Sequence, residues 1–364
     1  MRRVLPRPLV LAALVGLVAG CVDRAPTAPL AELRFSGSEG AAAGVTAMTQ
    51  NLYVGADVDA VIIALASPDP NDDVPALVNA IQTVGNTDFP ARAEAIADEI
   101  ARVRPHAVGL QEVEVLDIDL TPFGQPIVVD LDFLPILQAA LAARNLHYVV
   151  AAQVQNTAAV PVPGISLVDY DAILVDADRV TVTTAGGQNF FRNAGPVAPG
   201  VDLKRGWVWT RVMIAGTPYT FVSTHTEPDL AGASLAGLRE AQLTELVDSL
   251  AADQRVVMMG DFNDVPGSLM HQVVMGAGFT DAWAALRPGA IGYTCCHLSD
   301  LSDSVANFSQ RIDYVFSRGL GGGDPDVRLR GKVDRFGEVP SDRTAGPAYL
   351  IWPSDHAGLI ATLR

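Results

Sequence analysis

Carboxylate, amide and histidine side chains recur where apolar segments of the chain end. In chain order they are Asn51, Glu112, His225, Asp261, Asn263, Asp313, Asp355 and His356. Carboxylate and amide oxygens are ligands that Mg²⁺ accepts, and a histidine can gain or lose a proton near neutral pH. Brought together, such groups could bind a hard cation and move protons during a hydrolytic reaction.

Strands must position these residues, because each lies within, directly after or directly before a short apolar run. We expect strands over residues 45–51, 106–113, 218–225, 255–260, 311–317 and 357–363. Strand ends present their side chains to a common crevice, where the sites of α/β proteins form. The sequence therefore predicts one site built from residues far apart in the chain.

Helical periodicity is clearest over 90–104, where Ile96, Ile100 and Val103 share one face. Further helices are expected over 74–84, 132–145, 234–252 and 267–276, and further strands over 147–153, 171–175, 179–184 and 205–215. Segments 55–72 and 154–169 hold many turn residues, so we expect loops there. Interleaved helices, strands and hairpins predict an α/β fold of two mixed β-sheets packed face to face, with outer helices.

The composition is that of a globular protein. Of 364 residues, 49 % are hydrophobic and 18 % are charged, which excludes wholesale disorder. The net charge of −16 excludes a polybasic nucleic-acid binder. It does not exclude a metal-dependent phosphodiesterase, because a cation supplies positive charge at the phosphate. Six histidines and three cysteines are too few for a Cys-rich zinc module or a disulfide framework.

The N-terminus has the pattern of an export signal. Three arginines lie in residues 1–8, an apolar run fills 9–19, and Leu-Val-Ala-Gly-Cys at 17–21 resembles a bacterial lipobox. We expect a signal peptide over 1–20, followed over 21–44 by the lipidated Cys21 and a flexible tether. An ordinary secretory peptide or a short membrane helix is the alternative, but the apolar run is short for a bilayer.

The tether also bears on where the protein works. Cleavage removes the three arginines of the leader, so the net charge changes from −16 to −19. Anionic surfaces repel such a chain, so the lipid on Cys21 would be its membrane attachment. We expect an exported, lipid-anchored monomer of the cell envelope with no protein partner. By resemblance to Gram-negative lipoproteins, Val22 after the cysteine favours the outer membrane.

Six short motifs occur in a set order along the chain. They are Gln50-Asn51, Leu110-Gln111-Glu112, Ser223-Thr224-His225, Gly260-Asp261-Phe262-Asn263, Arg311-Ile312-Asp313-Tyr314 and Ser354-Asp355-His356. The set resembles the motifs of the endonuclease/exonuclease/phosphatase superfamily, in particular its deoxyribonuclease I-like and neutral sphingomyelinase-like branches. The resemblance covers most of residues 45–364 and implies a catalytic domain that is a four-layer α/β/β/α sandwich.

The resemblance implies a metal site. Glu112 and Asp355 would be ligands, and Asn51 would assist as a ligand or by orienting the substrate. Mg²⁺ is the expected ion, with Mn²⁺ or Ca²⁺ as alternatives. Asp261 would either orient the attacking water or bind metal, and Asn263 would donate to a phosphoryl oxygen.

The resemblance also implies two catalytic histidines. His356 would act as the base or stabilise the phosphate, and Asp313 on one ring nitrogen would select its tautomer. His225 matches a second histidine of the family. Asp171 is its expected acidic partner, and Asp169 is the alternative.

Several other polar residues have structural explanations. We expect His106 to be solvated, Glu227 to lie on a loop surface and Asp264 to cap a helix. Lys204 and Arg205 would either face the phosphate or provide surface charge on a hairpin. Cys295 and Cys296 would form a vicinal disulfide or stay free, in a loop near the site.

The expected activity is metal-dependent hydrolysis of a phosphodiester substrate, either nucleic acid or phospholipid. A deoxyribonuclease I-like nuclease is the first hypothesis, and a sphingomyelinase-like phospholipase C or a phosphomonoesterase is the second. A non-catalytic binding lipoprotein with the same fold is the third. Glu112, Asp261 and His356 are all present, which favours an enzyme.

Overall fold

The computed structural model describes residues 44–69, 71–230, 232–320 and 329–364, which belong to one compact unit. The expected signal peptide, Cys21 and the tether up to residue 43 lie outside the described residues. Within the described ranges, no helix is both long and apolar enough to cross a bilayer.

The larger sheet carries the first two motif strands side by side. Its order is β15-β18-β1-β2-β6-β5-β9-β8, with β3 and β4 attached next to β6. The bounds are β1 Val45–Asn51, β2 Ala107–Gln111, β3 Val115–Asp119, β4 Val128–Asp132, β5 Tyr148–Val162, β6 Ile165–Asp176, β8 Gly195–Ala198, β9 Val201–Leu203, β15 Gly331–Phe336 and β18 Gly358–Leu363. β1 runs parallel to β2 and antiparallel to β18, so Asn51 and Gln111 end neighbouring strands at the same edge.

The second sheet has the order β13-β14-β12-β11-β10-β7. Its bounds are β7 Thr181–Asn189, β10 Gly206–Ile214, β11 Thr217–His225, β12 Val256–Asp261, β13 Thr280–Asp281 and β14 Asp313–Arg318, while β16 Thr344–Ala345 and β17 Leu350–Ile351 form a separate small pair. The parallel pairing of β11 with β12 sets His225 opposite Asp261. The antiparallel pairing of β12 with β14 sets Asp313 opposite Asp261 on the other side. Three motif residues therefore lie side by side at one end of this sheet.

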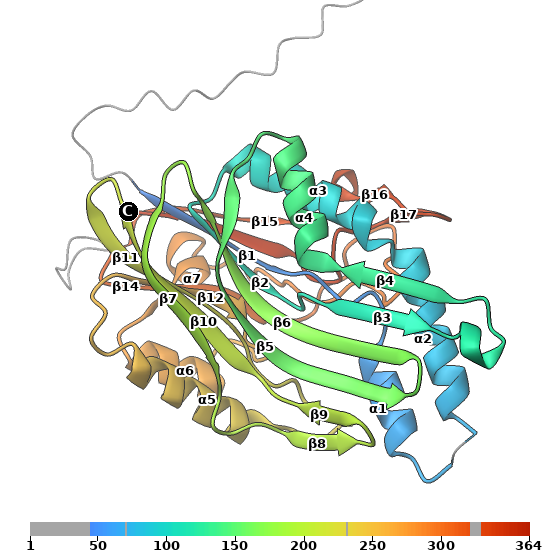
Figure 1. Cartoon of the computed structure of the whole chain (residues 1–364). Helices are drawn as coiled ribbons and strands as arrows, with labels where there is room; N and C mark the ends of the chain where they lie inside the picture. Colours follow the sequence, from blue (N-terminus) through green and yellow to red (C-terminus); the bar gives the residue numbers. More distant parts are fainter. Residues whose placement is uncertain (1–43, 70, 231, 321–328) are drawn as a thin grey trace, which may run out of the picture. The chain divides into compact units, whose positions relative to one another are not determined.

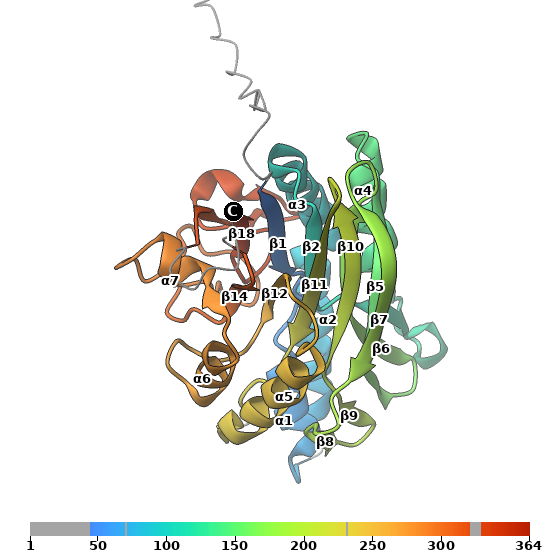
Figure 2. The same ribbon diagram turned by 90° about the vertical axis from the view of Figure 1, so that its left-hand side faces the viewer.

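Helices cover the outer faces of both sheets (Figures 1 and 2). Their bounds are α1 Val58–Ala66, α2 Asp73–Thr87, α3 Phe89–Val103, α4 Phe133–Ala143, α5 Ala236–Ser249, α6 Leu269–Gly276 and α7 Ala282–Leu286, with short 3₁₀ turns at Thr121–Phe123 and Pro340–Asp342. One apolar cluster joins α3 and α4 to β1 and β2, and another joins α5 and α6 to β12 and β14. A third lies between the sheets. The expected four-layer α/β/β/α sandwich is confirmed.

The two sheets approach each other closely where β2 carries a glycine. A Cβ built on Gly109 would lie 2.8 Å from Met259 Cγ and 2.8 Å from Ser223 Oγ, both on the second sheet. Next to it, Gln111 Nε2 donates to Ser223 Oγ at 2.8 Å. A side chain at position 109 would hold the sheets apart directly behind the site.

Two segments expected to be loops have regular structure. Within 55–72, α1 begins after Asp57, whose side chain accepts a hydrogen bond from Ala60 N at 2.9 Å and so caps the helix. Within 154–169, β5 and β6 continue as the long arms of a hairpin. The prolines and glycine of that segment lie at the turn and strand ends, where pairing tolerates them.

Candidate active site

A cavity of about 410 Å³ lies at the strand ends where the motifs meet. Six of the nine expected site residues line it, namely Glu112, His225, Asp261, Asn263, Asp355 and His356. Asn51 and Asp313 lie behind these residues and make hydrogen bonds to them. Asp171 is buried in β6 and does not line the cavity. The strand-end pattern thus predicted which residues meet at one cavity.

Asn51 joins the carboxylates of the two sheets. Its Nδ2 donates to Glu112 Oε1 at 2.9 Å and to Asp261 Oδ2 at 3.2 Å. Its Oδ1 accepts from the backbone N–H of Tyr53 at 2.8 Å, which fixes the direction of the amide. In this structure Asn51 therefore orients the two carboxylates, and its expected place among the metal ligands stays a prediction.

Glu112 adopts a backbone conformation that is uncommon for its residue type. Its φ of 52° is left-handed, and such residues cluster at functional sites. Besides the bond from Asn51, Glu112 Oε2 accepts from Val54 N at 3.0 Å. The carboxylate is thus held by two donors, one at the end of β1 and one in the segment that follows it.

Asp313 and His356 form the expected pair. His356 Nδ1 donates to Asp313 Oδ2 at 2.9 Å, and both side chains are buried. Burial alone would lower the pKa of His356, but Asp313, Asp355 and Asp261 together hold that pKa well above its usual value. These carboxylates therefore favour the protonated form of the ring, whose Nε2 is left free of Asp313.

The hydrogen-bond partner of His225 Nδ1 is the cationic Arg205, although an acidic partner was expected. Arg205 Nη1 lies 3.0 Å from His225 Nδ1 and 3.0 Å from Asp169 Oδ2, while no hydrogen bond joins His225 to Asp171 within the described residues. Burial first, and then Arg205, lower the pKa of His225 well below its usual value. A guanidinium only donates, so Nδ1 accepts from Arg205, while Asn263 Nδ2 lies 3.1 Å from Nε2. That nitrogen lies 3.6 Å from Asp261 Oδ2.

Arg205 belongs to a buried acidic group beside the cavity. Burial and the charge of Asp169 hold the pKa values of Glu114 and Asp171 well above their usual range. Burial also raises the pKa of Asp169, to about 6, although Arg205 opposes this shift. The sequence left Arg205 open between phosphate binding and surface charge, whereas it is buried and lines the cavity. Lys204, by contrast, pairs with Asp202 at the surface.

The acidic residues of the cavity fit a hard divalent cation. Burial raises the pKa values of Asp355 and Asp261 to about 7, and in each case Glu112 adds to the shift. Crowded carboxylates of this kind are stabilised by a cation that neutralises them. Glu112 and Asp355 would hold it. Ligand atoms of Asp261, Asp313 and His356 also lie within 4.8 Å of one another, but Nδ1 of that histidine is already taken by Asp313.

Arg92 is a positioning residue that the sequence analysis did not single out. It is buried in α3, and its guanidinium donates to the carbonyls of Leu52, Tyr53, Thr87 and Pro353. These carbonyls belong to the segment after β1, the end of α2 and the segment before Asp355. One side chain thus fixes two of the loops that form the cavity. An arginine within an amphipathic helix pattern carries no sequence signal for this role.

Three expectations for polar residues were wrong. Glu227 is fully buried, and its Oε1 accepts from Ala194 N at 3.0 Å. Asp264 accepts from Arg239 Nε at 3.1 Å, while Ser268 caps α6 instead. His106 is partly buried, and its Nδ1 accepts from Thr46 N at 3.0 Å. In each case a partner distant in the sequence provides the hydrogen bond.

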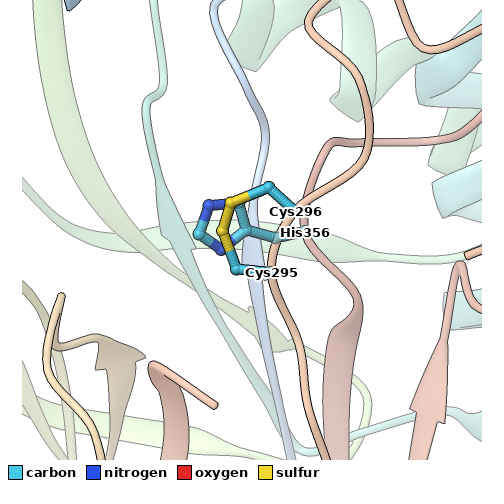
Figure 3. Close-up of side chains that lie close together, drawn as sticks. All are labelled: Cys295, Cys296 and His356. Atoms are coloured by element: carbon cyan, nitrogen blue, oxygen red, sulfur yellow. A yellow bond between two sulfur atoms is a disulfide. The ribbon is translucent and has the colours of Figure 1, made fainter. Parts of the chain in front are cut away.

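Cys295 and Cys296 are joined by a disulfide next to His356 (Figure 3). A sulfur of each cysteine and a ring nitrogen of His356 lie within 4.8 Å of one another. Cys296 also lines the cavity, as expected of a loop near the site. Of the two alternatives for these residues, the structure has the disulfide.

Sequence comparison identifies the family to which this fold and site belong. Residues 48–356 match the profile of the Endonuclease/Exonuclease/phosphatase family. Because the match spans most of the chain, the chain belongs to this family of phosphoesterases, which includes nucleases and phosphatases. Comparison with curated protein sequences finds no match.

Solved structures share the fold at low sequence identity. The Bacteroides thetaiotaomicron mannosyl-6-phosphatase Bt3783 is 17 % identical, with a TM-score of 0.53 over 88 % of this chain and 99 % of its own. The human Nocturnin catalytic domain is 15 % identical, with a TM-score of 0.53 over 88 % and 93 %. D. rerio TDP2, solved with a single-strand DNA product, is 15 % identical, with a TM-score of 0.51 over 89 % and 100 %. At these identities the likeness shows the fold alone.

Proposed function

We propose that this chain hydrolyses phosphodiester bonds with the help of a divalent metal ion, and that Mg²⁺ is the preferred ion. One observation carries the proposal: Glu112, Asp355 and Asp261 meet two buried histidines of opposite protonation state at one cavity. When bound, the cation would neutralise the charge of the nonbridging phosphate oxygens. The rest of the chemistry comes from the side chains of the chain.

The proton-handling groups divide the work between them. Asp261, with a pKa near 7, is poised to accept a proton from water, since a base works best near the ambient pH. Its orientation is fixed by Asn263 N at 2.9 Å from Oδ1 and by Asn51. His356 supplies positive charge and an N–H to a phosphoryl oxygen, while His225 lies between the guanidinium of Arg205 and the amide of Asn263 and positions both.

The test measures hydrolysis of bis-p-nitrophenyl phosphate and p-nitrophenyl phosphate after EDTA treatment and after addition of Mg²⁺, Mn²⁺ or Ca²⁺. We expect turnover of the diester that EDTA abolishes and a cation restores. Binding of Mn²⁺ is measured separately by calorimetry, so that a metal site without turnover is recognised. Binding without turnover of any ester would favour the non-catalytic alternative, and EDTA-resistant turnover would contradict the metal role.

The charge of the cavity wall favours a small phosphodiester substrate over a long polyanion. Arg205 is the one cationic lysine or arginine side chain among the described residues that line the cavity, and it is already paired with Asp169. Asp57 and Asp59 add negative charge to the cavity wall. Nicking of plasmid DNA, the first hypothesis from the sequence, is measured beside the small esters at equal metal concentration. Faster turnover of DNA would return the assignment to a nuclease.

We also propose that the protein is exported and held at the cell envelope by a lipid on Cys21, as a monomer. The lipobox pattern at 17–21 and the acidic charge of the remaining chain support this. An anchored phosphodiesterase would act on substrates outside the cytoplasm.

A further inference from the structure

A second cavity opens beside the first, between α1, α2 and the extended arms of β3, β5 and β6 (Figure 1 shows these elements together). Its volume is about 120 Å³, and every lining side chain is apolar except Thr157. The Thr157 hydroxyl lies 3.3 Å from Lys204 N and 3.4 Å from Lys204 O, so it is already engaged. We name this cavity the aliphatic slot.

The aliphatic slot adjoins the reaction cavity and shares lining residues with it. Val54, Ile62, Leu167 and Leu203 line both spaces. Val54 also donates its backbone N–H to Glu112 Oε2 at 3.0 Å, so a lining residue of the slot directly contacts a proposed metal ligand. A group in the slot would therefore lie near a phosphate held at Glu112, so that both could belong to one substrate molecule.

The chemistry of the slot selects its occupant. Apolar cavities of about 150 Å³ stay dry and bind molecules the size of benzene, so this slot accommodates roughly four to six carbon atoms. A nucleobase would bury polar groups that find no partner there, which costs binding. Two alkyl chains would not fit the volume. Val58 of α1, which lines both cavities, is 36 % exposed, as expected beside an entrance for an amphiphile.

We propose that the substrate is a phosphodiester carrying one alkyl chain, whose first carbons occupy the aliphatic slot while the phosphate lies at Glu112 and His356. This inference rests on the proposed function and specifies its substrate. The carbons nearest the phosphate carry the recognition, and a longer chain would extend past the slot without further contact.

The test uses alkyl 4-nitrophenyl phosphates that share one leaving group and differ in chain length from methyl to decyl. Each methylene that enters the slot should raise kcat/KM about fourfold, and the gain should stop near six carbons. Equal kcat/KM for methyl, propyl and hexyl esters would overturn the slot assignment. The same variation in alkylphosphonates, measured by calorimetry with Mn²⁺ present, reports binding without turnover.

A variant in which a larger side chain fills the slot provides the comparison with the unaltered protein. Ala80 of α2 lines the slot, and Ala80→Leu should reduce the hexyl-to-methyl ratio of kcat/KM to near one. Ala76→Leu changes a residue of the same helix that lines neither cavity and should keep the ratio. If Ala80→Leu does not fold, chain-length-dependent binding of phosphonates to the unaltered protein decides. Phosphonate binding that grows with chain length, without hydrolysis of any ester, would refute the proposed function and support the slot.

Discussion

The two histidines of the cavity are held in opposite states by neighbours of opposite charge. Asp313 keeps His356 protonated, while Arg205 and burial keep His225 neutral. Groups whose environments push their pKa values apart are the ones that can divide acid and base roles. The identity of each neighbour, rather than of the histidine, sets the role.

Asp313 and His356 should therefore act as one unit. Asp313→Asn keeps the shape but removes the charge and favours the wrong ring tautomer, so we expect turnover to fall by about 10²- to 10⁴-fold. The affinity for Mn²⁺, measured by calorimetry, should change little. The double variant Asp313→Asn/His356→Ala should be hardly slower than His356→Ala, because coupled residues are not additive. Multiplicative losses in this cycle would refute the pairing.

Glu112 should be indispensable for metal-dependent turnover. Glu112→Gln retains an oxygen that can accept from Val54 N but removes the negative charge, so the loop is preserved. We expect loss of nearly all Mg²⁺-dependent hydrolysis and a weaker affinity for Mn²⁺. Asp248→Asn, on the exposed side of α5, is the control and should behave as the unaltered protein. Normal hydrolysis by Glu112→Gln would mean that the ligand is misassigned.

His106 should make stability depend on pH. Burial, with Arg179, lowers its pKa to about 4, so the folded ring stays neutral while the unfolded ring titrates near 6.5. The unfolded chain binds the extra proton, so stability is full above pH 6.5 and is lost as the pH falls toward 4. From pH 7 to pH 5 the free energy of unfolding in urea should fall by about 2 kcal/mol. His106→Asn, which accepts but cannot titrate, should lack this part of the decrease.

At the scale of elements, β2 packs closely against the second sheet at Gly109, where no side chain intervenes. Gly109→Ala would place a methyl group 2.8 Å from Met259 Cγ and Ser223 Oγ, so the sheets must separate. We expect a loss of about 1–3 kcal/mol in the free energy of unfolding, measured in urea. Gly85→Ala in α2 meets no neighbouring atom and should instead gain about 0.5–1 kcal/mol. Equal behaviour of the two variants would argue against close packing at β2.

Sequence patterns predicted the elements whose formation depends on the local run of residues. The apolar runs that end in Glu112, His225 and Asp261 predicted strands, and those strands do meet at one edge. Arg205 and Arg92 could not be placed, because their partners are carboxylates and carbonyls distant in the sequence. The helix α1 was missed because its cap, Asp57, sits in a stretch otherwise rich in turn residues. Long-range contacts overrode these local signals.

At the scale of the whole molecule, the proposed lipid on Cys21 would decide where the protein works. Cys21→Ser should prevent lipidation, and the acidic chain should then appear in the soluble fraction after cell lysis. The unaltered protein should partition with membranes after a high-salt wash, as followed by immunoblot. Retention of Cys21→Ser on membranes after that wash would remove the lipoprotein assignment.

The pairing of β1 with β18 sets the moment at which activity can first appear during synthesis. Val45 lies opposite Leu363, and the Asp355-His356 motif directly precedes β18, so the site joins residues about three hundred positions apart. A nascent chain on the ribosome lacks both the closing strand and the imidazolium until residues up to Leu363 have emerged. Contacts of such separation form late and slowly. The nascent polypeptide is therefore inactive. The proposed hydrolysis can begin only after this entire segment has been translated and has folded.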